Sequence, residues 1–421
     1  MEKVDRSVVN MANKVNVLRI LWENKCIFRA EIARMTGLSQ PTVLKIVDEF
    51  MERGLVNISG KGISSGGKPP LMLEFRWDAY YIIGVDINEY RIEIILMDLS
   101  FDIIDKRIQD NREVDTADTI LKRLAEEIRE LIGEHPNEES RILGIGVGIP
   151  GIVDAQKGIL IYSTELGWKN VNLKEYLKQY FDGQITIDDS TRAFAIEEKI
   201  FGKGKDIKNF LCLNLASGIG SALVLDGNLY YGSSGSSGQL GHVAVEREGP
   251  LCSCGNYGCL EHYASGRAIE EAARRVVENH WESQITDLVY GDAGKVDLNI
   301  VFEAAMGGDR TALGILEKAS DYLAMAVSGV VNLTDPEMII CEGKISRECP
   351  IFMEMFKTAL RRRGMKYVGR EVEIVISNTE NYMGSFGSAS FILEQFIKSG
   401  GEAERFVRVR GNSNQRLDYV G

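Results

Sequence analysis

The sequence predicts an α/β protein of several domains, with a winged helix-turn-helix head in front of a two-lobed body. At 421 residues the chain has room for roughly three domains. Residues 1–76 carry a net charge of +4, so the rest of the chain carries −16. Glycine-punctuated strands then alternate with helices in two successive halves, as in an α/β protein with a ligand cleft. The charge asymmetry favours a nucleic-acid module attached to a body with another task.

The composition excludes several classes of protein. A content of 44% hydrophobic and 26% charged residues is typical of globular chains. The most apolar stretch, Phe210 to Tyr231, is interrupted by polar residues and glycines, so no membrane span is expected. The first six residues lack the apolar core of a signal peptide, which favours a cytoplasmic protein. Seven cysteines, an odd count, argue against a secreted disulfide framework.

Three helical stretches are predicted in the head. The first runs from Val8 to Trp22 with apolar residues at helical spacing, and the second covers residues 29–36. Gly37 fits a tight turn, Ser39 is a good N-cap for the third helix, and Pro41 suits its first turn. The third helix is expected to end near residue 53. This order of helix, turn and helix is typical of a DNA-binding module.

The third helix has one face suited to the core and one suited to DNA. Its apolar residues are Val43, Ile46, Val47 and Phe50. Two short strands follow, around a loop rich in glycine and lysine, and predict a β-wing. The expected DNA contacts, on the helix N-terminus and the wing, are Ser39, Gln40, Pro41, Thr42, Lys45, Lys61 and Lys68. The alternative is a head of residues 1–76 that serves dimerisation or protein docking.

The body opens with a buried strand at residues 80–87 that is expected to pair with residues 91–98. A helix is predicted from about 116 to 133, and residues 142–151 are expected to form a strand that ends in a tight turn. The strand at 185–189 ends in two carboxylates, Asp188 and Asp189. Residues 211–220 then begin a second series of the same kind.

One imidazole and three thiols lie close together in the second series. They belong to His242, Cys252, Cys254 and Cys259. This donor set suits a tetrahedral zinc ion, and Gly255 and Gly258 allow the loop to fold tightly around it. No ligand position is left vacant, so the ion is expected to be structural. The alternative is a loop with three buried free cysteines. The other cysteines, Cys26, Cys212, Cys341 and Cys349, are expected to be ordinary core or surface residues.

The segment 238–261, with these four residues, resembles the zinc signature of the ROK family (repressors, open reading frames and sugar kinases). The resemblance covers nearly the whole chain and includes residues 150–154, 167–168, 188–189, 332–337 and 384–389. With its winged head, the chain is similar to the transcriptional-regulator branch. The resemblance implies an actin/hexokinase-like body of two RNase H-like lobes, and an assembly as homodimer or homotetramer.

The resemblance also implies a sugar site and a zinc site. The sugar site would comprise Asp188, Asp189, Gln239, His242 and Glu261, and the zinc ligands would be His242, Cys252, Cys254 and Cys259. In kinase members the aspartate that matches Asp189 is the general base. The alternative for Asp188 and Asp189 is a pair of strand-end or capping carboxylates without a ligand.

Departures from the family pattern favour a regulator over a kinase. The first phosphate loop of the kinases reads Asp-x-Gly-Gly-Thr, whereas residues 86–90 read Asp-Ile-Asn-Glu-Tyr. A phosphate cradle needs closely approachable backbone N–H groups, and glycine permits that approach. Residues 341–344 also lack the glycine run of the kinases, although the second phosphate loop, 217–220, is better preserved. We therefore expect no catalysis, with Asp189 as a vestigial base position.

Three departures fall in the implied sugar site. Gln239 replaces the family's glutamate, Asp188 an asparagine, and Glu165 an asparagine of the Ser-x-Asn loop. They keep the site polar but change its pattern of donors and acceptors. For this reason the family does not supply the identity of the sugar.

The sequence thus favours a sugar-responsive transcriptional repressor, with operator DNA and a monosaccharide effector as partners, structural zinc and no membrane contact. The alternatives are an ATP-dependent sugar kinase with a DNA-binding head and a regulator controlled by protein docking. The expected domains are the head at 1–76, a first lobe at 79–195 with about 380–398, and a second lobe at 196–379. The last stretch, 399–421, is expected to form a loosely held tail or an oligomer contact.

Overall fold

The protein is seen here in a computed structural model that describes residues 6–61, 71–112, 116–364, 372–378 and 384–406. By their internal contacts the residues group into two compact units. The first comprises residues 1–148, 172–187 and 388–421, and the second comprises 149–171 and 188–387. Residues 149–171 and 188–195, which the sequence analysis assigns to the first lobe, therefore group with the second unit. Among the described helices, none is long and apolar enough to cross a membrane.

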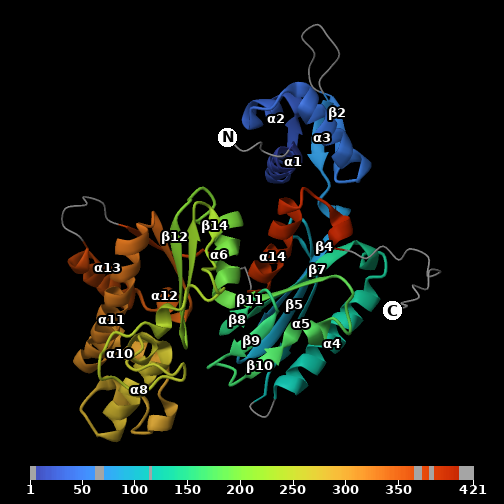
Figure 1. The fold of residues 1–421 in the computed structure, drawn as a ribbon. Coiled ribbons are helices and arrows are strands. Elements are labelled where there is room, and N and C mark those ends of the chain that lie inside the picture. The colour runs from blue at the N-terminus through green and yellow to red at the C-terminus, as the bar shows by residue number, and fades with distance from the viewer. Residues whose placement is uncertain (1–5, 62–70, 113–115, 365–371, 379–383, 407–421) are drawn as a thin grey trace, which may run out of the picture. The chain divides into compact units, whose positions relative to one another are not determined.

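The head of the first unit has the predicted helices and one extra strand (Figure 1). Its elements are α1 (Arg6–Glu23), β1 (Cys26–Phe28), α2 (Arg29–Thr36), α3 (Gln40–Glu52), β2 (Val56–Lys61) and β3 (Leu71–Phe75). Strand β3 lies between β1 and β2 and pairs antiparallel with both. The wing strands are confirmed, whereas the three-residue β1 is too short to give a periodic signal in the sequence.

The turn between α2 and α3 forms as its residues dictate. Gly37 has a left-handed φ of +69°, which glycine adopts at little cost. The Ser39 hydroxyl oxygen accepts from the backbone N–H of Thr42 at 3.4 Å and caps α3. On α3, the buried residues are the four that the sequence analysis selected, Val43, Ile46, Val47 and Phe50. The polar N-terminal residues of α3 are consequently left on the other face.

The rest of the first unit is built on a five-stranded sheet with the order β11-β7-β4-β5-β6. Its strands are β4 (Tyr81–Ile87), β5 (Arg91–Asp98), β6 (Ile103–Asp110), β7 (Ile142–Ile149) and β11 (Gln184–Asp189). Strand β4 pairs antiparallel with β5, as predicted, and parallel with β7. The associated helices are η1 (Trp77–Ala79), α4 (Ala117–Glu134), η2 (Glu139–Arg141) and α5 (Leu173–Leu177).

Helix α14 (Gly384–Lys398) packs tightly against this sheet. A methyl group at Gly146 of β7 would lie only 1.8 Å from the carbonyl oxygen of Ser388, so only glycine permits this approach. Along α14, Phe391, Ile392, Leu393 and Phe396 are buried. The helix therefore belongs to the core of the first unit rather than to its surface.

Residues 399–406 begin the stretch that was predicted to form a loosely held tail or an oligomer contact, and they pack against the head. Gly401 has a φ of +74°, and a methyl group there would lie 2.9 Å from Leu55 and 3.3 Å from Leu18 of the head. Arg53 donates to the carbonyl oxygen of Gly400 at 3.4 Å. We call this contact between the head and residues 400–401 the C-terminal anchor. The glycines of this segment suggested flexibility in the sequence, but in the structure they allow close packing. Residues 407–421 lie outside the described part of the chain.

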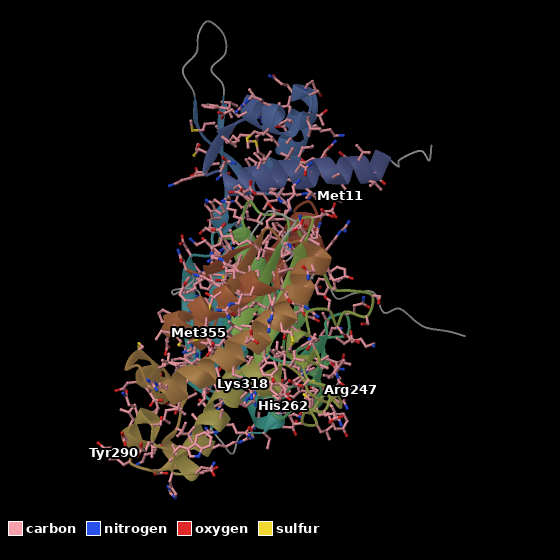
Figure 2. The ribbon with its side chains drawn as sticks, turned by 90° about the vertical axis from the view of Figure 1, so that its left-hand side faces the viewer. Met11, Arg247, His262, Tyr290, Lys318 and Met355 are labelled. Carbon is pink, nitrogen blue, oxygen red and sulfur yellow. The ribbon has the colours of Figure 1, made fainter. Side chains whose placement is uncertain are left out.

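Met11, labelled in Figure 2, also belongs to the anchor, because its sulfur would lie 3.0 Å from a methyl group at Gly400. A second set of contacts holds the head to the sheet. Trp22 of α1 donates from its indole nitrogen to the carbonyl oxygen of Leu99 at 2.8 Å and packs edge-on against Trp77. The head is thus held on both sides within the first unit.

The second unit contains two sheets. The smaller has the order β10-β9-β8, from β8 (Ile152–Asp154), β9 (Ile159–Tyr162) and β10 (Lys169–Asn172). The larger has the order β14-β13-β12-β15-β16, from β12 (Phe210–Leu215), β13 (Ile219–Leu225), β14 (Asn228–Leu229), β15 (Met338–Glu342) and β16 (Glu373–Ile376). When the strands of each five-stranded sheet are numbered in chain order, both sheets have the order 3-2-1-4-5, read from β6 in the first sheet and from β14 in the second. This repeat confirms the two successive halves.

Helices supply most of the core around the larger sheet (Figure 1). They are α6 (Ser190–Ile200), η3 (Leu240–His242), α7 (Glu261–Ala264), α8 (Gly266–Glu278), α9 (Gln284–Leu288), η4 (Ala293–Lys295), α10 (Leu298–Met306), α11 (Arg310–Thr334), α12 (Lys344–Glu348) and α13 (Pro350–Arg363). The buried side chains of α8, α10, α11 and α13 form one continuous apolar cluster with β12 and β15. This rigid core positions the loops described next. In the first unit, the short helix η5 (Ala403–Arg405) is the last element of the described residues.

Candidate functional site: a polar pocket beside a cysteine cluster

A polar pocket lies entirely within the second unit and has a cavity volume of about 110 Å³. Its walls come from residues 150–151, 163–165, 189–191, 214–221 and 238–242, together with Glu261. Four of the predicted sugar-site residues, Asp189, Gln239, His242 and Glu261, meet there. The cavity is much smaller than the ~300–1,000 Å³ of pockets for drug-sized ligands, so it suits a single small ring.

Asp189 lies at the junction of β11 and α6. One of its carboxylate oxygens caps α6 by accepting from the backbone N–H groups of Thr191 at 2.9 Å and Arg192 at 3.3 Å. Burial raises the pKa of Asp189 to about 6, against the opposing charge of Arg192. Asp189 therefore caps α6, which was one alternative considered for it, and its side chain also lines the pocket.

Asp188 is placed differently from the sequence expectation. Its side chain is 1% exposed and does not line the pocket. The carboxylate oxygen Oδ1 lies 2.8 Å from Nη1 of Arg192 and accepts from the backbone N–H of Asp189. Successive side chains of a strand point to opposite faces, so Asp188 and Asp189 at the end of β11 do not face the same space.

Glu165 lines the pocket, although the sequence analysis treats it only as a departure from the family pattern. A methyl group at Gly218 would lie 2.8 Å from Oε1 of Glu165 and 3.0 Å from Oε1 of Glu261. Both carboxylates therefore face the turn that begins the preserved second phosphate loop. Asn214, at the end of β12, lines the pocket as well and was missed. Its position at the carboxyl end of a central strand is the signal that would have found it.

The cysteine cluster adjoins this pocket. One ligand atom from each of His242, Cys252, Cys254 and Cys259 lies within 4.8 Å of the others. Cys252 Sγ is 3.6 Å from His242 Nδ1, and Cys254 Sγ is 3.6 Å from Cys259 Sγ. Zn–S bonds of ~2.3 Å in a tetrahedron place two sulfurs about 3.8 Å apart, so the residues fit such an ion. The exposed His262, labelled in Figure 2, lies outside this group.

The backbone around the cluster is fixed by close packing. Gly258 has a φ of +68°, and a methyl group there would lie 1.8 Å from the carbonyl oxygen of Glu246. Helix η3 carries both Gln239, as its N-cap, and His242. His242 Nδ1 is 3.9 Å from Oε2 of Glu261. A metal held by this cluster would therefore fix the orientation of His242 next to two pocket residues.

In the first unit, the turn that matches the kinases' first phosphate loop is closed by its own side chain. Asn88 Oδ1 accepts from the backbone N–H groups of Tyr90 at 3.0 Å and Arg91 at 3.1 Å. Asn88 Nδ2 donates to Asp86 Oδ2 at 2.9 Å. The backbone N–H groups of Tyr90 and Arg91 are thus already paired within the turn by the Asn88 side chain.

We expect Asp86→Asn to stabilise the protein at neutral pH. Burial raises the pKa of Asp86 to about 6, above its unfolded value near 3.8. The native state therefore holds the proton more tightly, and the charged form costs stability above about pH 6, a cost that fades as the pH falls to about 4. The substitution should add about 1–2 kcal/mol of unfolding free energy at pH 7.5 and little at pH 4, in urea unfolding curves.

Asp154→Asn serves as the control for this prediction. Lys157 lowers the pKa of the half-buried Asp154 through a hydrogen bond of 2.8 Å, so neutralising this residue should bring no gain at pH 7.5. An Asp86→Asn protein as stable as the wild type at both pH values would contradict the assigned burial cost.

Five of the predicted DNA contacts lie at or near the N-terminus of α3. Ser39, Gln40, Pro41 and Lys45 are exposed, and Thr42 is half-buried with its hydroxyl 2.8 Å from that of Ser39. Leu44, which the sequence analysis assigns to neither face, is also 41% exposed and lies beside Lys45. Lys61 is the last residue of β2, and Lys68 lies outside the described residues.

A winged helix-turn-helix head on a body with two equivalent sheets and a small polar pocket defines a sugar-kinase-like protein with a DNA-binding module. The model of the ROK family matches residues 82–395, and a winged helix-turn-helix DNA-binding model matches residues 12–57. The chain belongs to the ROK family. This confirms the family and the fold that the sequence suggested.

Relatives of two kinds resemble the chain. The xylose repressor of Caldicellulosiruptor bescii is 27% identical over 93% of this chain and 98% of its own length. The glucokinase of Thermotoga maritima is 33% identical over 75% of this chain and 98% of its own. The crystal structure of a ROK family transcriptional regulator, a homologue of the Escherichia coli MLC protein, aligns with a TM-score of 0.80 and 24% identity over 93% of this chain and 98% of its own, which supports the fold.

Proposed function

We propose that the protein is a transcriptional repressor whose hold on operator DNA depends on a monosaccharide in the pocket of the second unit. The proposal is carried by two observations made within separate units: the closed turn at Asn88 in the first unit and the polar pocket in the second. The body keeps polar groups suited to a sugar, while the turn that would cradle phosphate is filled by a side chain. The head adds an exposed recognition face.

The chemistry of the pocket suits a sugar ring. Sugar hydroxyls both donate and accept hydrogen bonds, and Asp189, Glu165 and Glu261 offer acceptors while Gln239 offers both kinds of group. Asp188, which faces Arg192, is left out of the proposed ligand set. The names of the relatives point the same way, since they include a xylose repressor and the Escherichia coli regulator NagC, which is 25% identical over 89% of this chain and 90% of its own.

Zinc is the proposed occupant of the cysteine cluster, held by His242, Cys252, Cys254 and Cys259. With four protein ligands it would act as a structural crosslink and supply no open coordination position. The pocket residue Gln239 lies three positions before His242, and Glu261 two positions after Cys259. The cluster is therefore proposed to set the geometry of this pocket wall.

On DNA, the N-terminus of α3 is proposed to enter the major groove, with the wing of β2 and β3 against the backbone. A homodimer or homotetramer would place two heads on an operator with two-fold symmetry. To regulate, the sugar must bind one conformation of the protein more tightly than the other, because equal affinity shifts no equilibrium. The same argument holds for an inducer and for a co-repressor.

The deciding experiment is fluorescence anisotropy of the protein on its own upstream DNA, titrated with a panel of monosaccharides. We expect one sugar to change the DNA affinity at least tenfold, while ADP release from ATP and the same sugar stays at background. Sugar-dependent ADP release would favour the alternative, a sugar kinase with a DNA-binding head. Tight DNA binding that ignores every sugar would favour control by protein docking. Absence of specific DNA binding would overturn the proposal.

A further inference from the structure

Arg192 is a buried arginine that does not line the pocket itself but binds residues adjacent to two of its walls. It lies on α6 and is 2% exposed. Its Nη1 lies 2.8 Å from Asp188 Oδ1, and its Nη2 donates to the carbonyl oxygens of Gly235 at 2.6 Å and Ser237 at 3.0 Å. All of these residues belong to the second unit.

The first wall contains Asp189. Asp188 Oδ1, which receives the guanidinium, also accepts from the backbone N–H of Asp189 at 2.8 Å. Arg192 itself contributes a backbone N–H to the Asp189 carboxylate at 3.3 Å. The position of Asp189 in the pocket is therefore fixed through groups that Arg192 holds on both sides.

The second wall contains Gln239. Arg192 binds two carbonyl groups of the segment 235–237, which leads directly into Gly238 and Gln239. Ser221 donates to the carbonyl oxygen of Gly238 at 2.7 Å, and a methyl group at Gly238 would lie 2.4 Å from the carbonyl oxygen of Ser221. The segment is thus fixed on one side by β13 and on the other by the guanidinium.

The guanidinium is the group that this arrangement requires. Its planar fork presents donors in several fixed directions, whereas a lysine ammonium is a single point charge. Buried charge-assisted hydrogen bonds are stronger than neutral ones, and loss of one partner leaves the other desolvated and unpaired. Arg192 also lies over the ring of Tyr231, at 5.2 Å from its centroid. The residue is therefore held rigidly while it holds its neighbours.

We propose that Arg192 is a positioning residue that sets the distance between Asp189 and Gln239 and thereby determines sugar affinity without touching the sugar. This inference rests on the proposed sugar site. It also assigns a task to the aspartate at 188, which stands where the family has an asparagine. The aspartate supplies the charge that keeps the arginine buried between the two walls.

The test measures sugar affinity by isothermal titration calorimetry for the full chain, using the sugar that responds in the DNA assay. Arg192→Lys should weaken binding about tenfold or more, because the bonds to both walls do not survive together. Arg274→Lys is the matched control. Arg274 also binds a carboxylate four residues earlier, Glu270 at 3.2 Å, and a backbone carbonyl, that of Val296 at 3.3 Å, but neither partner lines the pocket. This control should bind sugar as the wild type does.

A double-mutant cycle with Gln239→Ala separates positioning from general stability. If Arg192 acts through Gln239, the losses from Arg192→Lys and Gln239→Ala are less than additive, whereas those from Arg274→Lys and Gln239→Ala simply add. Asp188→Asn is the second variant, for the case that Arg192→Lys does not fold, and it should also weaken binding about tenfold. Additive losses, or folded variants with wild-type affinity, would overturn the positioning role of Arg192 but would leave the proposed function intact. A wild-type protein that binds no sugar would overturn the proposed function and the inference with it.

Discussion

Replacing Gln40 and Lys45 together by alanine is expected to weaken operator binding about 100-fold. Both side chains are exposed near the N-terminus of α3, while the core residues of the helix lie on its other face. Glutamine binds adenine through two hydrogen bonds, worth ~1–3 kcal/mol, and lysine pairs with phosphate. Fluorescence anisotropy over a range of salt concentrations measures both effects, and loss of the lysine should lower the salt slope by about one.

Lys25→Ala is the control for charge, since it removes an exposed lysine of the same head outside α3. It should leave the preference for the operator over unrelated DNA unchanged. If the Gln40 and Lys45 double variant binds the operator with wild-type affinity, another surface of the head reads the DNA. Circular dichroism of the variant then confirms that the head is still folded.

Cys259→Ser is expected to remove the metal and most of the sugar affinity in one step. Cys259 is fully buried within the cluster, and a serine hydroxyl is a poor replacement for a thiolate ligand of zinc. We expect about one zinc per chain in the wild type and none in the variant, by elemental analysis. With the loop released, His242 no longer fixes the wall of Gln239 and Glu261, so sugar affinity should fall ~10–100-fold.

Cys349→Ser tests whether loss of any buried thiol has this effect. Cys349 is buried in the apolar core of the same unit but takes no part in the cluster. Its serine variant should keep the zinc and the sugar response. A Cys259→Ser protein that still binds sugar like the wild type, or a wild type without metal, would contradict the proposed role of the cluster.

The sequence predicted those parts of the fold that rest on local chemistry. The apolar spacing of α3, the cap at Ser39 and the left-handed Gly37 are properties of a few neighbouring residues, and they were confirmed. The donor cluster at residues 242–259 followed from ligand types alone. Strand β1 was missed because it spans three residues and owes its existence to pairing with β3.

The parts that escaped prediction depend on which way a side chain points, or on a partner far along the chain. Asp188 and Asp189 carry the same carboxylate group, but they lie on opposite sides of the strand. Asp188 binds Arg192, whereas Asp189 lines the pocket. The turn at Asn88 is closed because the Asn88 side chain binds the backbone of the residues that follow it. The sequence alone indicated only that the glycines of the kinase loop were absent. Glu165 lies in the pocket next to Gly218, which is more than fifty positions later in the sequence.

The C-terminal anchor also bears on how the chain is made. Leu18 and Leu55 leave the ribosome long before Gly401, which packs against both of them. N-terminal segments generally begin to fold while synthesis continues. Here the head gains its contact with Gly401 only after the body has been synthesised. We therefore expect a chain that stops within the body to carry a less stable head.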